Sequence, residues 1–108
     1  MNDTELDTQV APKTEETITL AQPIVRGAQT IATLVIRKPK PLNMRGMKIL
    51  DILQLDVDCI VTLAQRVATP PLTDIEARNL DPADITKIGM AVQGFFVDPS
   101  AAREADNA

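Results

Sequence analysis

Residues 30–36, Thr-Ile-Ala-Thr-Leu-Val-Ile, decide the fold class of this 108-residue chain. They are rich in β-branched side chains and apolar on both faces, which is typical of a fully buried strand. Residues 17–21 alternate with period two, which predicts an earlier, half-buried strand. Because Pro23 and Gly27 interrupt the connection, we expect an antiparallel hairpin with a long or bulged loop. Two strands alone are marginal in water, so helices, another copy or a partner must cover the second strand.

The chain after the hairpin predicts a first helix. Pro39 and Pro41 end the second strand, since neither can donate a backbone hydrogen bond. We expect Asn43 to cap a helix that begins near Met44. The residues predicted to form its buried stripe are Met47, Ile49, Leu50, Ile52 and Leu53.

A second helix follows, and either Asp56 or Asp58 can begin it. The sequence leaves open whether residues 54–56 break the helix or continue it. The predicted apolar stripe comprises Val57, Ile60, Val61, Ala64, Val67 and Ala68. Residues 69–71, Thr-Pro-Pro, end this helix. Cys59 lies among apolar residues, so we expect a buried, unreactive thiol, which suits a reducing cytosol.

The last third of the chain carries the clearest local signals. Thr73 and Glu76 have the spacing of a capping box, which begins a short helix ending near Asn79. Asp81 then caps another helix, with Pro82 at its first position. Leu80 and Ile85 have the spacing of a hydrophobic staple. The predicted buried face of this last helix comprises Ile85, Ile88, Val92, Phe95 and Phe96.

These elements predict a single α+β domain over residues 16–97. It comprises an N-terminal antiparallel β-hairpin followed by a small bundle of three to four α-helices. Residues 1–15 are expected to form a flexible acidic arm and residues 98–108 a flexible tail. Gly89 and Gly94 lie inside the last predicted helix, where glycine indicates close approach of another element.

The composition excludes most catalytic devices. The chain has no His, one Cys, and only 2% aromatic residues. A Ser-His-Asp triad, a disulfide framework and a Cys/His zinc site are therefore impossible. Asp56 and Asp58 are better explained as helix-capping acids than as part of a metal site. We expect no enzyme activity, cofactor or metal. No signal peptide or membrane span is visible, so we expect neither secretion nor membrane insertion.

Charge is divided along the chain. Residues 1–21 carry a net charge of −4, residues 22–69 carry +4 and residues 70–108 carry −4. Five cations in the middle have no acid between them: Arg37, Lys38, Lys40, Arg45 and Lys48. They form a solvated surface, a phosphate-binding patch, or a patch that meets an acidic protein or the chain's own acidic arm. The acidic total and the scarcity of aromatics argue against nucleic acid.

Several short motifs together resemble a known family. They are Thr-Ile-Thr-Leu…Pro-Ile at 17–24, Arg-Lys-Pro at 37–39, Arg-Gly at 45–46 and the apolar run at 58–64. Pro70-Pro71 and Leu80-Asp81-Pro82-Ala83-Asp84 follow in the same order. The sequence thereby resembles the small tail assembly chaperones, of the E or 41/14 type, of contractile-tailed, Mu-like bacteriophages. The similarity covers residues 16–97. One departure is Asn43, where the family often has Asp.

This resemblance implies a non-enzymatic chaperone that binds the phage tape-measure protein and keeps it soluble while the tail tube assembles. It further implies a longer form made by frameshifting, self-association, and work in the cytoplasm of the infected host. The alternatives are a structural tail or virion component and a small nucleic-acid-binding regulator. The candidate partner-binding residues are Ile36, Arg37, Lys38, Arg45, Met47, Phe95 and Phe96.

Overall fold

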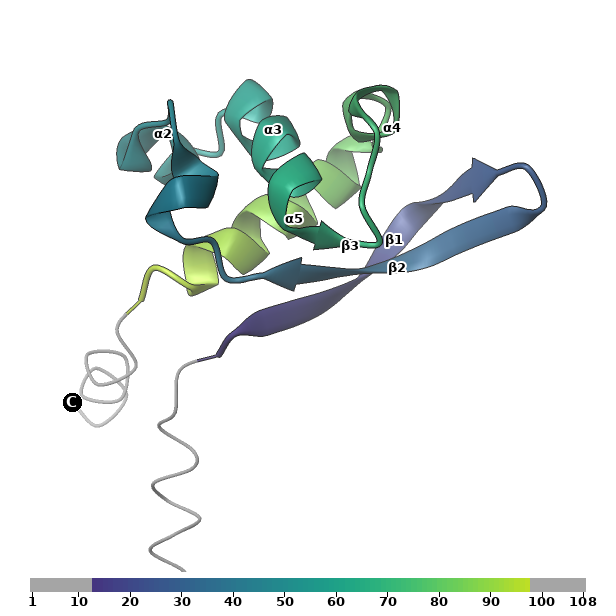
Figure 1. The fold of residues 1–108 in the computed structure, drawn as a ribbon, viewed down its shortest axis with the longest axis horizontal. Coiled ribbons are helices and arrows are strands. Elements are labelled where there is room, and N and C mark those ends of the chain that lie inside the picture. The colour runs from purple at the N-terminus through teal and green to yellow at the C-terminus, as the bar shows by residue number, and fades with distance from the viewer. Residues whose placement is uncertain (1–12, 98–108) are drawn as a thin grey trace, which may run out of the picture.

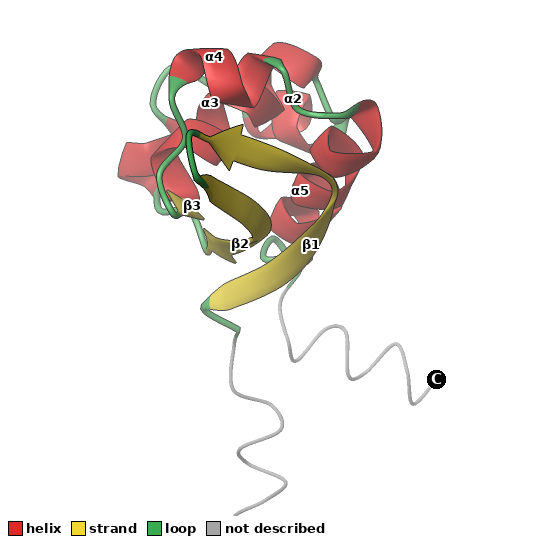
Figure 2. Cartoon of the chain, turned by 90° about the vertical axis from the view of Figure 1, so that its right-hand side faces the viewer, coloured by secondary structure: helices red, strands yellow, loops and turns green. Residues whose placement is uncertain are grey.

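The computed structural model describes residues 13–97, so the predicted tail and residues 1–12 of the predicted arm lie outside the described residues. The described chain begins with a β-hairpin and continues into helices, with a third short strand between them (Figure 1). The three strands form one antiparallel sheet in the order β1-β2-β3. The α+β prediction, with a hairpin followed by four α-helices, is confirmed. The helices pack on one side of the sheet, as Figure 2 shows from the end of the molecule.

The hairpin is longer and more tightly connected than the sequence predicted. β1 spans Glu15–Arg26 and β2 spans Gln29–Arg37. Only Gly27 and Ala28 connect them, and Gly27 has the positive φ (+55°) that such a turn favours. The expected long connection is therefore wrong. Pro23, which suggested it, lies within β1 instead.

The irregularity that the sequence placed in the loop is a bulge inside β1. Thr19 pairs with Thr33, but the next paired residue of β1 is Ile24, opposite Ile31. Four residues of β1, 20–23, thus face a single residue of β2. Pro23 is tolerated there because a bulge does not require its missing N–H. The bulge divides the hairpin into a half near the helices and a half near the turn.

A short strand, β3 (Ala68–Thr69), was not predicted. It pairs with Val35 and Ile36, so the end of β2 lies between two strands. The peptide bond between Thr69 and Pro70 is cis. The apolar β2 is thus covered within this chain: the helices and β3 bury Leu34 and Ile36 completely.

The region after β2 differs most from the sequence-based expectation. A 3-10 helix, η1, spans Pro41–Met44, and α2 spans only Ile49–Leu53. Asn43 does not cap a helix from Met44, because Gly46 (φ +80°) turns the chain between the two helices. Its side chain instead accepts a hydrogen bond from the N–H of Lys40, at 2.9 Å.

The predicted buried stripe of this first helix is also wrong. Ile52 is the α2 side chain that is fully buried, and Met47 before the helix is half-buried. Three residues assigned to the core lie at the surface instead: Ile49 (57% exposed), Leu50 (59%) and Leu53 (43%). A helix of little more than one turn buries one side only, and that side holds Ile52.

The second helix, α3 (Val57–Val67), forms much as predicted. Leu55 has a positive φ of +59°, which is incompatible with a continuous helix. Residues 54–56 therefore interrupt the helix rather than continue it. Asp56 is the N-cap and accepts a hydrogen bond from the N–H of Cys59, at 3.0 Å. The predicted stripe is buried except at its first residue, Val57, and its last residue, Ala68, belongs to β3.

The capping signals of the last third are confirmed. In α4 (Asp74–Arg78), Thr73 Oγ1 accepts from the Glu76 N–H, and the Glu76 carboxylate accepts from the Thr73 N–H. α5 (Pro82–Gly94) begins after Asp81, whose carboxylate accepts from the Ala83 N–H.

The predicted face of α5 lies toward the core, although only Ile88 and Val92 are fully buried. Ile85, Phe95 and Phe96 are half-buried, and the helix ends at Gly94. Close approach is confirmed at Gly89, where a Cβ would meet the Leu55 side chain. It is wrong at Gly94, which has open space around it.

Candidate partner-binding surface

The five cations of residues 37–48, here called the basic segment, lie on the surface. All five side chains are exposed. The ion pairs within residues 13–97 involve other cations: Lys13, Arg26, Arg78 and Lys87. Within the described chain the basic segment therefore has no carboxylate partner at ion-pair distance. A cluster of unneutralised cations favours an acidic ligand.

Hydrogen bonds hold the basic segment against the rest of the domain. The Lys38 N–H donates to the carbonyl of Thr14 at 2.9 Å, which joins the segment to the first residues before β1. Pro39 is buried, although the lysines on either side are exposed. The backbone of the segment is thus anchored while its charged side chains extend into solvent.

Arg66, near the end of α3, is a sixth cation in this region, which sequence reasoning missed. Its guanidinium donates to the carbonyl oxygens of Asn43 (2.7 Å) and Arg45 (3.0 Å). The Arg37 guanidinium in turn donates to the carbonyl of Arg66, at 2.9 Å. A basic residue in the last turn of a helix was the available signal, but it did not indicate which carbonyls the side chain would reach.

The exposed side chains of Ile49, Leu50 and Leu53, here called the α2 apolar surface, follow directly on the basic segment. Leu53 lies four residues after Ile49 and three after Leu50, so the three side chains share one side of α2. Leu42, in η1, is 70% exposed. Large exposed apolar side chains grouped beside polar ones are characteristic of protein interaction sites.

The predicted residues Arg45 and Met47 line a surface depression of about 330 Å³ next to α3. Its lining also includes three acids and Cys59. Burial, aided by Asp51 and Asp56, raises the pKa of the Cys59 thiol, which opposes formation of a reactive thiolate. The buried, free Cys59 thus agrees with the prediction. Within the described part of the chain, no three His, Cys, Asp or Glu side chains group closely enough to hold a metal ion.

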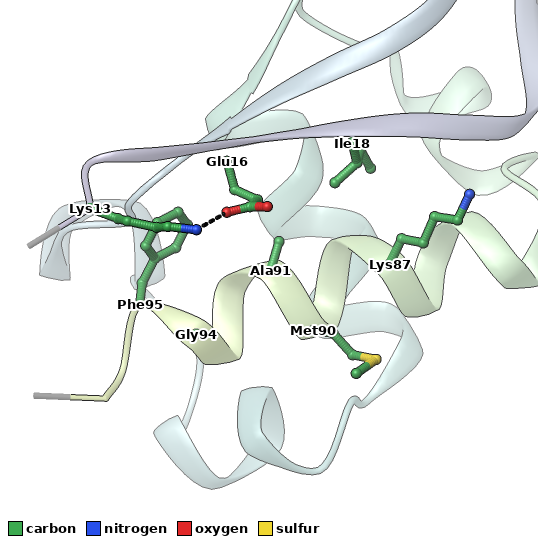
Figure 3. Close-up of a pocket in the computed structure, with 8 residues that line it drawn as sticks. All are labelled: Lys13, Glu16, Ile18, Lys87, Met90, Ala91, Gly94 and Phe95. Carbon is green, nitrogen blue, oxygen red and sulfur yellow. Dashed lines mark hydrogen bonds and ion pairs between the residues drawn. The ribbon is translucent and has the colours of Figure 1, made fainter. Parts of the chain in front are cut away.

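Phe95 lies elsewhere, in a groove of about 540 Å³ between β1 and the C-terminal half of α5 (Figure 3). Lys13, which also lines this groove, pairs with Glu16 at 2.8 Å. Met90, on the same helix, is exposed at the edge of the groove. The predicted residues therefore fall on more than one surface of the molecule rather than in a single pocket.

Four predicted binding residues belong partly or wholly to the core. Ile36 has no exposed surface, because β1 and β3 flank it and the helices cover it. It cannot contact a partner in this conformation, which corrects the prediction. Met47, Phe95 and Phe96 are half-buried and pack against the core.

Asp84, on α5, is a buried acid to which the sequence analysis assigned no role. It is fully buried, and its carboxylate accepts hydrogen bonds from the N–H groups of Ala21 (2.6 Å) and Gln22 (3.1 Å). Lys87, one turn later, lies 3.8 Å from Asp84 Oδ1 and donates to the carbonyl of Thr19 at 2.7 Å. Asp84 thus supplies the bulge with acceptors that β2 does not, and Lys87 bonds to the residue just before the bulge. Both side chains therefore hold β1 against α5.

A second long-range pair attaches the turn half of the hairpin to α4. The Arg26 guanidinium donates two 2.7 Å hydrogen bonds to the Glu76 carboxylate. The same guanidinium donates to the carbonyl of Pro71. The Arg26 hydrogen bond is the main reason that the pKa of Glu76 falls from 4.5 to about 2, with the Thr73 N–H contributing next.

A cluster of cations beside large exposed apolar side chains, on a small α+β domain, is typical of protein-binding modules. Residues 17–97 match the family model of phage tail assembly chaperone proteins, E, or 41 or 14, and the chain belongs to this family.

Two relatives come from Escherichia phage P2. Tail assembly protein E is 31% identical over 82 residues, which cover 76% of this chain and 90% of the relative. Tail assembly protein E' is 31% identical over 83 residues, which cover 77% of this chain but only 58% of the relative. This chain thus aligns with little more than half of E'. No solved structure matches it significantly. None of the helices within residues 13–97 has the length and apolar character needed to cross a membrane.

Proposed function

We propose that this chain binds the tape-measure protein of its phage and keeps it soluble while the tail tube assembles, without catalysing a reaction. The observation that carries the proposal is the α2 apolar surface beside the basic segment. Exposed apolar side chains on a helix cover the apolar stripe of an amphipathic partner helix, and flanking cations favour acids beside that stripe. A long helical protein presents many such stripes.

The binding residues that we propose are Arg37, Lys38, Arg45 and Met47, together with the α2 apolar surface. Phe95 and Phe96, at the end of α5, form a second contact region. The C-terminal end of α5 lies at the same end of the molecule as α2 and the end of β2 (Figure 1). Several copies bound along one partner gain affinity through avidity, so each single contact can be weak.

We further propose that a longer form of this protein shares the same domain through frameshifting, and that both act in the host cytoplasm. Support comes from the two phage P2 relatives, which align with almost the same length of this chain. The alignment covers 90% of protein E but only 58% of protein E', so E' is the longer protein and contains a similar domain. Intact-mass measurement of the products expressed from the native gene tests this. A single product would contradict the longer form.

The main test is co-expression of the tape-measure protein with the wild-type chain or with Leu50→Glu/Leu53→Glu. Both leucines are exposed, so the double variant should fold while losing the apolar contact. We expect it to leave the tape-measure protein mostly in the insoluble fraction. The matched control is Ile75→Glu, since Ile75 is 71% exposed on α4, away from α2 (Figure 1). This control should retain full activity.

Equal solubility of the tape-measure protein with and without this chain would contradict the proposal. Mass spectrometry of purified virions separates a chaperone from a structural tail component, because a chaperone should be absent or present in traces. A mobility shift with DNA or RNA at physiological salt would favour the nucleic-acid alternative, since the same cations could bind phosphates.

A further inference from the structure

The basic segment lies directly beside the point where the first twelve residues of the chain join the domain. The Lys38 N–H donates to the carbonyl of Thr14, and Glu15 pairs with Arg37 in the sheet. Thr14 and Glu15, one and two residues after Lys13, are thus held beside Lys38 and Arg37. Residues 1–12 therefore join the domain next to the first two cations of the basic segment.

The charges of the two segments are complementary. Residues 1–12 contain three acids, Asp3, Glu5 and Asp7, and no Lys or Arg. The basic segment contains five cations, and none of them has a carboxylate within 4.0 Å among the described residues. An acidic chain tethered beside unneutralised cations has a high effective concentration at them.

The length of the N-terminal segment is sufficient. Asp3 lies ten residue steps before Lys13 and reaches at most about 35 Å from it when extended, and the ten steps from Lys38 to Lys48 also span at most about 35 Å. Every cation of the basic segment is thus accessible to an acid of residues 1–12. From these observations, we propose that residues 1–12 bind the basic segment of the same chain and compete there with acidic ligands.

The competition has a consequence that rests on the function proposed above. A partner with acids beside its apolar stripe must displace residues 1–12 before it uses the cations. The N-terminal segment then lowers affinity for non-partner polyanions and weakens binding to the partner by the same competition. The intramolecular contact itself does not depend on the identity of the partner, so it can be tested without one.

The test compares two triple variants of the full chain by amide NMR at low salt, about 20 mM, where the Debye length is about 20 Å. The arm-neutral variant is Asp3→Asn/Glu5→Gln/Asp7→Asn. The matched tail-neutral variant is Asp98→Asn/Glu104→Gln/Asp106→Asn, which changes the net charge by the same +3. We expect the arm-neutral variant to shift the amide signals of Lys38, Lys40, Arg45 and Lys48, and the tail-neutral variant to leave them in place.

The shifts should disappear when wild type and variant are compared near 1 M salt, because the Debye length falls to about 3 Å. Unchanged amides in the arm-neutral variant, or equal shifts in both variants, would overturn the proposal. Equal shifts would show that net charge alone moves the signals.

A spin label distinguishes a contact within one chain from a contact between copies. Cys59 is the only cysteine and is buried, so Thr4→Cys in a Cys59→Ala background offers a single labelling site. We expect broadening at residues 38–48 that does not change on dilution. A second sample mixes spin-labelled chains that carry no isotope with isotope-enriched chains that carry no label. The same broadening in that mixture would assign the contact to a second copy and refute the intramolecular proposal.

A polyglutamate peptide provides the competition readout. It should bind the arm-neutral variant several-fold more tightly than the tail-neutral variant at low salt. Equal affinities would overturn the competitive part of the proposal, because the two variants have the same net charge.

Discussion

The buried carboxylate of Asp84 accepts a 2.6 Å hydrogen bond from the backbone N–H of Ala21, across 63 positions of the chain. Ala21 lies in the bulge of β1, where pairing with β2 is interrupted. A buried carboxylate needs hydrogen-bond donors, and the bulge N–H groups lack acceptors on β2, so the start of α5 completes the hydrogen bonding that the hairpin lacks. This bond connects the hairpin to α5 at the bulge, which is the point that divides the hairpin into its two halves.

Replacing Asp84 should therefore destabilise the whole domain. Asp84→Ala leaves two bulge N–H groups without their acceptor and removes the carboxylate beside Lys87, and we expect a loss of about 3 kcal/mol in the free energy of unfolding. Asp84→Asn keeps one acceptor oxygen and should lose roughly half as much. The exposed Asp58→Ala is the control and should change stability by less than about 1 kcal/mol. Urea unfolding followed by circular dichroism is suitable, since the chain has no Trp or Tyr. Equal losses for Asp84→Ala and Asp58→Ala would contradict this stabilising role of the Asp84 hydrogen bonds.

The Arg26–Glu76 pair should make stability depend on acid pH. The pKa of Glu76 is lowered from 4.5 to about 2 in the folded protein, so the ionised form is favoured by folding. Its stabilising effect is fully present above pH 4.5 and is lost as the pH falls toward 2. The urea midpoints of wild type and Glu76→Gln should therefore converge over this range. Midpoints that stay parallel from pH 7 to pH 2 would show that the pair does not act in this way.

Gly89 and Gly94 offer a matched pair of substitutions with opposite expected signs. Gly89→Ala places a Cβ against the Leu55 side chain, and we expect a loss of about 1 kcal/mol from overpacking. Gly94→Ala meets open space, so the better helix propensity of Ala should stabilise by up to about 1 kcal/mol. In a Leu55→Ala background, Gly89→Ala should become neutral or stabilising. A persistent loss in that background would mean that Leu55 is not the cause.

Arg66 should control local order in the candidate site more than global stability. Arg66→Lys cannot reproduce two hydrogen bonds to the carbonyls of Asn43 and Arg45 from one planar group. We expect faster hydrogen exchange over residues 43–48, with a change in unfolding free energy below about 1 kcal/mol. The control is Arg78→Lys, which alters an exposed pair on α4 and should leave this exchange unchanged. Uniformly faster exchange across the domain would instead indicate a global effect.

Local signals in the sequence were sufficient for the helix starts of the last third. Thr73 and Glu76 are three residues apart, and Asp81 needs only the N–H of Ala83. Such partners lie within one helical turn, so their geometry follows from the backbone alone. The hairpin and the α+β class were predictable for a similar reason, because strand and helix periodicities are local.

The candidate site was predictable only in part. The basic segment is contiguous in sequence, and its exposure follows from its charge. The α2 apolar surface was assigned to the core instead, because helical spacing shows which residues share a side but not which side is covered. The positive φ angles of Gly46 and Leu55 limit α2 to the five residues between them that are helical, and only Ile52 of these is fully buried.

The sequence by itself determined the class of elements, their caps in the last third, the cluster of cations and the absence of histidine. Tertiary structure decided the bulge in β1, the pairing of β3, the placement of Arg66 and the burial of Asp84. The physical reason is distance along the chain. Asp84 looks like an ordinary acid in the first turn of a helix, and only the packing of α5 against β1 removes it from water and gives it two N–H donors.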